Sequence, residues 1–157
     1  MKPRLYLETT IPSYLVSRRS RNVVVAGHQE ITRLWWEHRR QHYDLYVSAL
    51  VRREVSAGNV ELARKRMALV AGLQVLEVTD AVANLSEHLL QRRIVPATAA
   101  TDAGHIALAA VHGMHYLLTW NCGHIANAAV RNRIRLACEE LHFECPIICT
   151  PEMLMEG

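Results

Sequence analysis

Short apolar, β-prone runs alternate with longer helical segments along this chain, and this alternation constrains the fold more than any other feature. The runs cover residues 5–7, 45–47, 75–78, 116–119 and 146–149. A helix between two such runs carries the chain back to the edge of the sheet where the previous strand began, so the strands pair in parallel. The sequence therefore predicts an α/β fold, with about five parallel strands covered by helices on both faces.

The ends of the predicted helices are marked by residues that cap or stop a helix. Side-chain caps are expected at Thr10, Ser48, Asn59 and Thr79. The expected helices cover residues 27–41, 49–55, 59–71, 80–93, 101–112 and 124–142, after a first helix that begins near Thr10. Pro12 is tolerated in the first turn of that helix. Gly113 is expected to stop the helix before it.

Length and composition favour one intracellular domain. The chain has 157 residues, so we expect residues 1–157 to form a single domain. No apolar stretch approaches the roughly 20 residues that a membrane span needs. Glu8 comes too early for a signal peptide, and we expect a cytoplasmic protein. The four cysteines form no CxxC pair, so reduced thiols are favoured over a zinc site.

Polar side chains follow the predicted strands at the point where each strand ends. Glu8 follows the first strand, Asn121 follows the fourth, Glu54 lies in the helix after the second, and Asp102 opens a later helix. Carboxyl ends of parallel strands meet at one edge, and oxygen ligands there suit Mg²⁺ or Mn²⁺. Alternatively, each residue acts alone: Asp102 at a helix start, Asn121 in a turn and Glu54 in solvent. The residues alone leave both interpretations open.

Histidines and arginines add further candidates near these positions. Of nine histidines, His105 and His124 stand out because they lie beside Asp102 and Asn121. The net charge is +3, and the arginines occur in clusters. Arginine suits phosphate contact, and the cluster on the loop after the first helix is a candidate to hold an RNA backbone, with solvated surface as the alternative. This cluster comprises Arg18, Arg19 and Arg21.

Four short motifs, in this order, resemble the PIN-domain family. They are residues 6–10 (YLETT), 48–54 (SALVRRE), 101–107 (TDAGHIA) and 118–121 (LTWN). The similarity extends over nearly the whole chain, and it is greatest to the VapC-like branch of toxin ribonucleases. The stretch 119–127 (TWNCGHIAN) and the tail 150–152 (TPE) resemble one subgroup of that branch. The resemblance implies a PIN-like α/β/α sandwich.

The resemblance also implies an activity and a set of site residues. PIN domains of this kind are Mg²⁺- or Mn²⁺-dependent endoribonucleases, frequently homodimeric, and the toxins among them are held by a small antitoxin protein. The four acidic positions of the family correspond to Glu8, Glu54, Asp102 and Asn121, with the metal on Glu8, Asp102 and Glu54. The supporting positions correspond to Thr9 and Thr119, and His124 is a candidate phosphate contact.

Two of the four acidic positions depart from the usual family pattern. Aspartate is usual at the first and fourth positions, where this chain has Glu8 and Asn121. Asn121 keeps an oxygen and lacks the charge, which is expected to weaken metal affinity. The main hypothesis is therefore a metal-dependent ribonuclease that acts on RNA. The alternatives are a PIN module that has lost catalysis and binds RNA or a protein, and an unrelated small-molecule α/β enzyme.

Overall fold

The computed structural model describes residues 1–156, and it contains the predicted α/β/α sandwich. Within these residues, five strands form one parallel sheet in the order β3-β2-β1-β4-β5. Their bounds are β1 Arg4–Leu7, β2 Asp44–Ser48, β3 Gln74–Leu76, β4 Tyr116–Leu118 and β5 Ile147–Cys149. The order places β1 at the centre of the sheet, with β2 and β4 as its neighbours.

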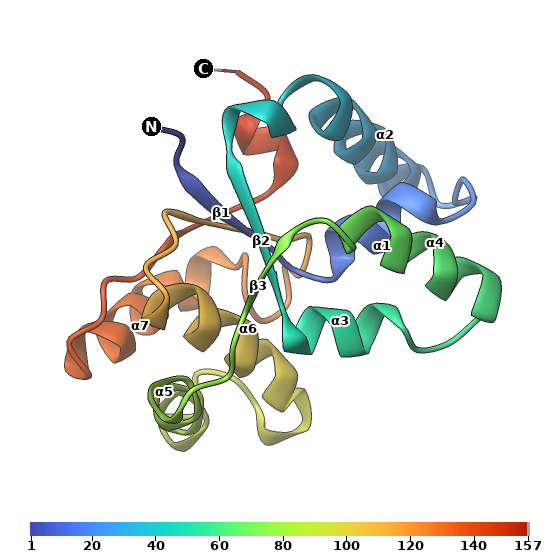
Figure 1. The fold of residues 1–157 in the computed structure, drawn as a ribbon. Helices are drawn as coiled ribbons and strands as arrows, with labels where there is room; N and C mark the ends of the chain where they lie inside the picture. The colour runs from blue at the N-terminus through green and yellow to red at the C-terminus, as the bar shows by residue number, and fades with distance from the viewer. Residues whose placement is uncertain (157) are drawn as a thin grey trace.

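Helices cover both faces of this sheet. Their bounds are α1 Thr10–Val16, α2 Val23–His38, α3 Ala49–Val55, α4 Val60–Val70, α5 Asp80–Gln91, α6 Ala100–Val111 and α7 Ala128–Glu140. Short 3₁₀ turns lie at Arg40–His42, Ala97–Ala99 and Pro151–Leu154. Figure 1 shows α1, α2 and α4 on one side of the sheet and α5, α6 and α7 on the other. Among the described residues, no helix has the length and hydropathy to cross a membrane.

Three of the four predicted helix caps are confirmed, and one is wrong. The side chains of Ser48, Asn59 and Thr79 each accept a hydrogen bond from a backbone N–H in the first turn of α3, α4 and α5. The N-cap of α1 is Thr9, and it makes no side-chain cap bond. Thr10 lies inside α1, where its hydroxyl group donates to the carboxylate of Glu8 instead of capping the helix.

Three elements have bounds that differ from those predicted, two because of capping residues and one because of strand pairing. Helix α2 begins at Val23, since the Asn22 side chain accepts from two first-turn amides. Helix α7 begins at Ala128 because Asn127 caps it, so residues 124–127 precede the helix. The third strand is shifted to Gln74–Leu76 by its pairing with β2. Gly113, with φ +69°, follows α6 as expected for a stop signal.

The hydrophobic core lies on both faces of the central strands. Leu5, Tyr6 and Leu7 of β1 are fully or almost fully buried, as a central parallel strand requires. Trp35 of α2 is completely buried in the same core, whereas Val23 and Val24 at the start of α2 are exposed. Trp35 is therefore part of the core, whereas Val23 and Val24 lie on the surface.

Candidate active site

Glu8 lies at the carboxyl end of the central strand β1, where it is fixed by hydrogen bonds from two neighbouring segments. Its Oε1 atom accepts from the Thr10 backbone N–H at 3.0 Å, from the Thr10 hydroxyl group, and from the Thr119 hydroxyl group at 2.8 Å. Thr119 follows β4, which pairs directly with β1. Only 4% of Glu8 is exposed. These donors hold a buried carboxylate in one orientation.

The other carboxylate oxygen of Glu8 is open to the site. Within residues 1–156, no hydrogen bond reaches Glu8 Oε2. The buried side-chain atoms without a partner in this part of the chain are Trp35 Nε1, Arg39 Nε and His88 Nε2, so Glu8 Oε2 keeps contact with solvent. Glu8 therefore presents one oxygen to whatever occupies the site.

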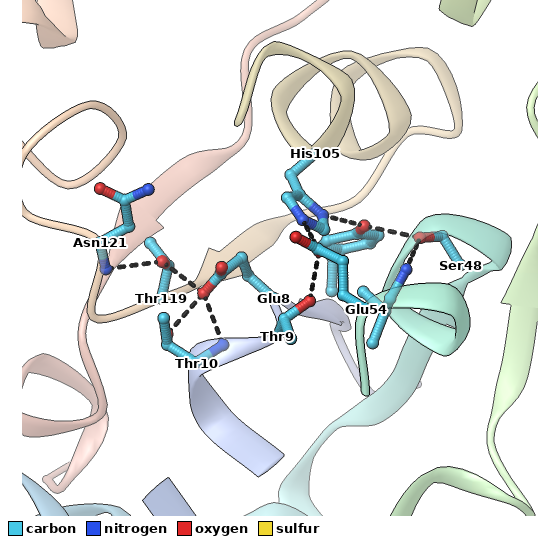
Figure 2. A network of polar contacts seen from close by, with 10 residues as sticks. Glu8, Thr9, Thr10, Ser48, Glu54, His105, Thr119 and Asn121 are labelled. Carbon is cyan, nitrogen blue, oxygen red and sulfur yellow. Dashed lines mark hydrogen bonds and ion pairs between the residues drawn. The ribbon is translucent and has the colours of Figure 1, made fainter. Parts of the chain in front are cut away.

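Glu54 lies in α3, which begins directly after β2. Its side chain contacts Thr9, the residue that follows Glu8. The Thr9 hydroxyl group donates to Glu54 Oε1 at 2.6 Å, and His105 Nε2 lies 2.6 Å from the same oxygen. Figure 2 shows the carboxyl groups of Glu8 and Glu54 on adjacent sides of one site, with the His105 ring beside Glu54. Burial alone raises the pKa of Glu54, but the bonds from His105 and Thr9 outweigh it, so the pKa is lowered below its ordinary value.

Asp102, at the start of α6, is connected to the loop after β4 rather than directly to the glutamates. Its Oδ2 atom lies 2.8 Å from His124 Nδ1. The backbone N–H of His124 donates to Asn121 Oδ1 at 3.0 Å, and the backbone N–H of Asn121 donates to the Thr119 hydroxyl oxygen at 2.9 Å. Asn121 Oδ1 is thus bonded within its own turn. This contact is consistent with the interpretation of Asn121 as a turn former.

The predicted site residues are therefore linked in two branches that start at Glu8. Thr9 connects Glu8 to Glu54, and Thr119 connects Glu8 to Asn121, whose turn carries His124 and hence Asp102. Within residues 1–156, no three His, Cys, Asp or Glu side chains form a group that could hold a metal ion. The predicted metal group of Glu8, Glu54 and Asp102 is thus not assembled as one cluster among the described residues. His105 bonds the carboxylate of Glu54, and His124 bonds that of Asp102.

The donor chemistry of these carboxylates nevertheless fits a hard divalent cation. Glu8 Oε2, Glu54 Oε2 and Asp102 Oδ1 accept no hydrogen bond from any of residues 1–156. Carboxylate oxygens are the ligands that Mg²⁺ and Mn²⁺ prefer, with water completing the shell. Each acid therefore keeps one oxygen for a ligand and uses the other to fix its side chain.

The loop that carries the arginine cluster borders a groove of about 730 Å³ between α1 and α2. Arg19 and Arg21 line this groove, together with Tyr14 of α1 and Arg33 of α2, which pairs with Glu30. Arg18 is exposed on the same loop and is not among the lining residues. The groove is thus lined by more arginines than acids.

One residue that the sequence analysis missed holds this loop in place. The Gln29 side chain donates to Ser17 Oγ at 2.7 Å and to the Arg18 carbonyl oxygen at 3.0 Å, and it accepts from the Ser20 N–H at 2.9 Å. A glutamine in mid-helix gives no sequence signal for such a role, because its partners come from a loop about ten residues away.

Tyr6 is the second residue that the sequence analysis missed. Its hydroxyl group bonds to both Ser48 and His105 in the interior, at 2.8 and 2.7 Å. Burial raises the pKa of Tyr6 far above its ordinary value, so its hydroxyl group stays protonated. An apolar-strand tyrosine is ordinarily a packing residue, and only its position next to His105 in three dimensions reveals the polar contact.

Comparison with solved structures places this fold in a known class. The chain is similar to one in the crystal structure of VapBC2 from Rickettsia felis bound to a DNA fragment from their promoter. The TM-score is 0.52 and the identity 14%, and the match covers 93% of this chain and 97% of that chain. This fold is PIN-like. No protein-family model and no curated protein sequence matches the chain. The similarity therefore shows the fold of this chain.

Proposed function

We propose that this chain is a metal-dependent endoribonuclease of the PIN type, acting as the toxin of a type II toxin–antitoxin pair. The observation that carries the proposal is the set of carboxylates at the carboxyl edge of a PIN-like sheet. Glu8, Glu54 and Asp102 come from three separate segments, and each keeps an oxygen that no group within residues 1–156 uses. In open α/β sheets, ligands bind at this edge.

The proposed mechanism assigns a role to each group. Glu8, Glu54 and Asp102 would hold Mg²⁺ or Mn²⁺, which polarises a phosphodiester and activates a water molecule when bound. Glu54 would orient the attacking water, since its lowered pKa keeps it a carboxylate that can accept a hydrogen bond. Thr9 and Thr119 would keep the two glutamates in position through their hydroxyl groups.

The remaining candidates would contact the RNA. His124 is partly exposed beside Asp102, where its ring can reach a substrate phosphate. The arginines of the loop between α1 and α2 would bind the RNA backbone, because their guanidinium groups line or flank one groove. These are Arg18, Arg19 and Arg21. Asn121 would contribute through its turn, which positions His124.

The test is cleavage of RNA in the presence of Mn²⁺. We expect cleavage by the wild-type protein and none by Asp102→Ala. Asp44→Ala is the matched control, because Asp44 is a partly buried acid at the start of β2, the opposite edge of the sheet, and should leave cleavage unchanged. Equal cleavage by wild type and Asp102→Ala would show a contaminating nuclease and contradict the proposal.

A second candidate function is a PIN module that has lost catalysis and binds RNA or a protein partner. Two observations favour it: Asn121 uses its oxygen within its own turn, and no three-residue metal group is assembled within residues 1–156. Titration of Mn²⁺ into the purified protein separates the two candidates. Binding that Asp102→Ala abolishes supports the nuclease, and absence of binding at millimolar Mn²⁺ supports the impaired module.

Protein partners form the last part of the proposal. One structural neighbour comes from the structure of VapBC2 bound to a DNA fragment from their promoter, and by analogy we propose a small antitoxin partner for this chain, in the cytoplasm. We also propose a homodimer, for which light scattering of the purified chain is the direct measurement. A short adjacent gene that encodes a DNA-binding protein, and co-purification of its product, would support the antitoxin. A chain that is monomeric, or has no such neighbour, would contradict these assignments.

A further inference from the structure

A buried chain of hydrogen bonds runs from the start of α3 to the carboxylate of Glu54. The Val51 N–H donates to Ser48 Oγ at 3.1 Å, and Ser48 Oγ lies 2.8 Å from the Tyr6 hydroxyl oxygen. That oxygen lies 2.7 Å from His105 Nδ1, and His105 Nε2 lies 2.6 Å from Glu54 Oε1. Figure 2 shows this chain between Ser48, His105 and Glu54. Ser48, Tyr6 and His105 are all fully buried.

Burial determines the direction in which each hydrogen of this chain must point. Ser48 Oγ accepts from Val51 N–H, and the Ser48 hydroxyl hydrogen needs an acceptor of its own. Within residues 1–156, the acceptor in reach is the Tyr6 hydroxyl oxygen. The Tyr6 hydrogen must then go to His105 Nδ1, which accepts only if it carries no proton. The ring proton of His105 is therefore on Nε2, facing Glu54.

The opposite direction leaves a buried group without a partner. If Tyr6 donated to Ser48, the Ser48 hydroxyl hydrogen would have no acceptor among the described residues, which is strongly disfavoured in a protein interior. An unprotonated Nε2 would also face the Glu54 carboxylate with a lone pair. Tyr6 cannot ionise to relieve either problem, because burial raises its pKa far above the ordinary value.

We infer that His105 is a positioning residue: Ser48 and Tyr6 fix its ring as the neutral Nε2–H tautomer, and this ring then donates to Glu54 and holds its carboxylate in one orientation. Thr9 donates to the same Oε1 atom, so Oε2 is directed to the site. The tautomer is a property of the free protein. Its consequence for cleavage rests on the proposed nuclease function.

The tautomer is tested by long-range ¹H–¹⁵N correlation spectra of the histidine rings in the metal-free wild-type protein. The His105 signals are assigned by their loss in His105→Gln. We expect Nε2 to show the shift of a protonated nitrogen and Nδ1 that of an unprotonated one. A proton on Nδ1, or on both nitrogens, would overturn the inference. The wild-type spectrum decides this point, so a variant that folds poorly does not weaken the test.

The role of Tyr6 is tested with a variant that removes only a hydroxyl group. In Tyr6→Phe we expect the His105 signals to shift toward a mixture of tautomers. The matched control is Tyr46→Phe, since Tyr46 is the registered neighbour of Tyr6 on β2 and its hydroxyl group makes no hydrogen bond within residues 1–156. The control should keep the wild-type signals. An unchanged His105 spectrum in Tyr6→Phe would overturn the assignment of Tyr6.

Cleavage kinetics separate positioning from simple structural support. Tyr6→Phe should lower kcat about tenfold with little change in KM, as the loss of a group that orients a ligand does. Tyr46→Phe should match wild type in both constants. Equal kcat in Tyr6→Phe and wild type would overturn the inference that the His105 ring, fixed by Tyr6, positions the Glu54 carboxylate. If no protein cleaves RNA and the wild-type ring still carries its proton on Nε2, the nuclease proposal fails while the tautomer stands.

Discussion

Thr119 donates its hydroxyl hydrogen to Glu8 Oε1 across 2.8 Å, and both side chains are buried. The contact joins residues 111 positions apart in the sequence, at the carboxyl ends of the neighbouring strands β1 and β4. The Thr119 oxygen also accepts the backbone N–H of Asn121. One hydroxyl group therefore fixes the first acid of the site and starts the turn that leads to His124.

Thr119→Val should destabilise the protein, because valine keeps the shape and removes both hydrogen bonds. The carboxylate of Glu8 and the amide of Asn121 would each lose a partner, and we expect a loss of about 1–3 kcal/mol in the free energy of unfolding. Urea unfolding measures the change. Thr98→Val is the control, since Thr98 is exposed in the 3₁₀ turn before α6. Equal midpoints for both variants would contradict the importance of the Glu8–Thr119 contact.

Asn121→Asp should strengthen metal binding. Asn121 Oδ1 accepts the His124 backbone N–H, and an aspartate oxygen can accept the same bond, so the turn should be kept. The added negative charge should tighten Mn²⁺ binding on the order of tenfold, since ligand charge is a main determinant of divalent-cation affinity. Isothermal titration with Mn²⁺ measures it. An affinity equal to that of the wild type would show that position 121 lies outside the metal site.

Glu54 should contribute a component of stability that depends on pH. Its pKa is lowered in the folded state, so the carboxylate stabilises the fold above its unfolded pKa of about 4.3, and this contribution is lost as the pH falls toward the lower folded value. The component should be modest, because 31% of the Glu54 side chain is exposed. We expect the stability advantage of wild type over Glu54→Gln to shrink between about pH 6 and pH 3.

Urea unfolding of both proteins across this range measures the pH component. Glu77→Gln removes an exposed glutamate and serves as the control, for which the difference from wild type should vary little with pH. A Glu54→Gln difference that stays constant, or that grows at low pH, would contradict the lowered pKa.

The loop arginines should account for part of the salt dependence of RNA binding. In a cleavage-deficient Asp102→Ala background, Arg19→Ala/Arg21→Ala should reduce the slope of log K against log salt by roughly 0.7 per lost phosphate contact. Fluorescence anisotropy with single-stranded RNA measures the slope. Arg64→Ala, which removes an exposed arginine paired with Glu61 on α4, is the control. Equal slopes for the two variants would place the RNA elsewhere.

The fold was predictable from sequence because its signals are local. Short apolar runs, capping residues and stop residues act within a few positions, and they indicated the parallel sheet and most helix starts. The first helix was placed with the wrong cap because Thr9 and Thr10 are equally good caps by type. Only the position of Glu8 beside Thr10 decides that the Thr10 hydroxyl bonds to the acid and not to the helix.

The sequence indicated the positions of the candidate site, but not the hydrogen-bond network that joins them. Edge topology and the family resemblance indicated Glu8, Glu54, Asp102 and Asn121. The partners of these residues depend on side-chain directions that no short motif specifies. Tyr6 resembles any core residue in the sequence, yet its hydroxyl group contacts His105, and Asn121 turns its oxygen toward His124 rather than toward Glu8.

The most direct measurement of the central claim is a crystal structure with Mn²⁺ soaked in, with the ion located by its anomalous scattering. We predict one strong peak at the carboxyl edge of the sheet, bound by oxygens of Glu8, Glu54 and Asp102 at about 2.0–2.3 Å, within the range of hard divalent cations. No peak at that edge at millimolar Mn²⁺, or a peak bound only by surface residues elsewhere, would contradict it.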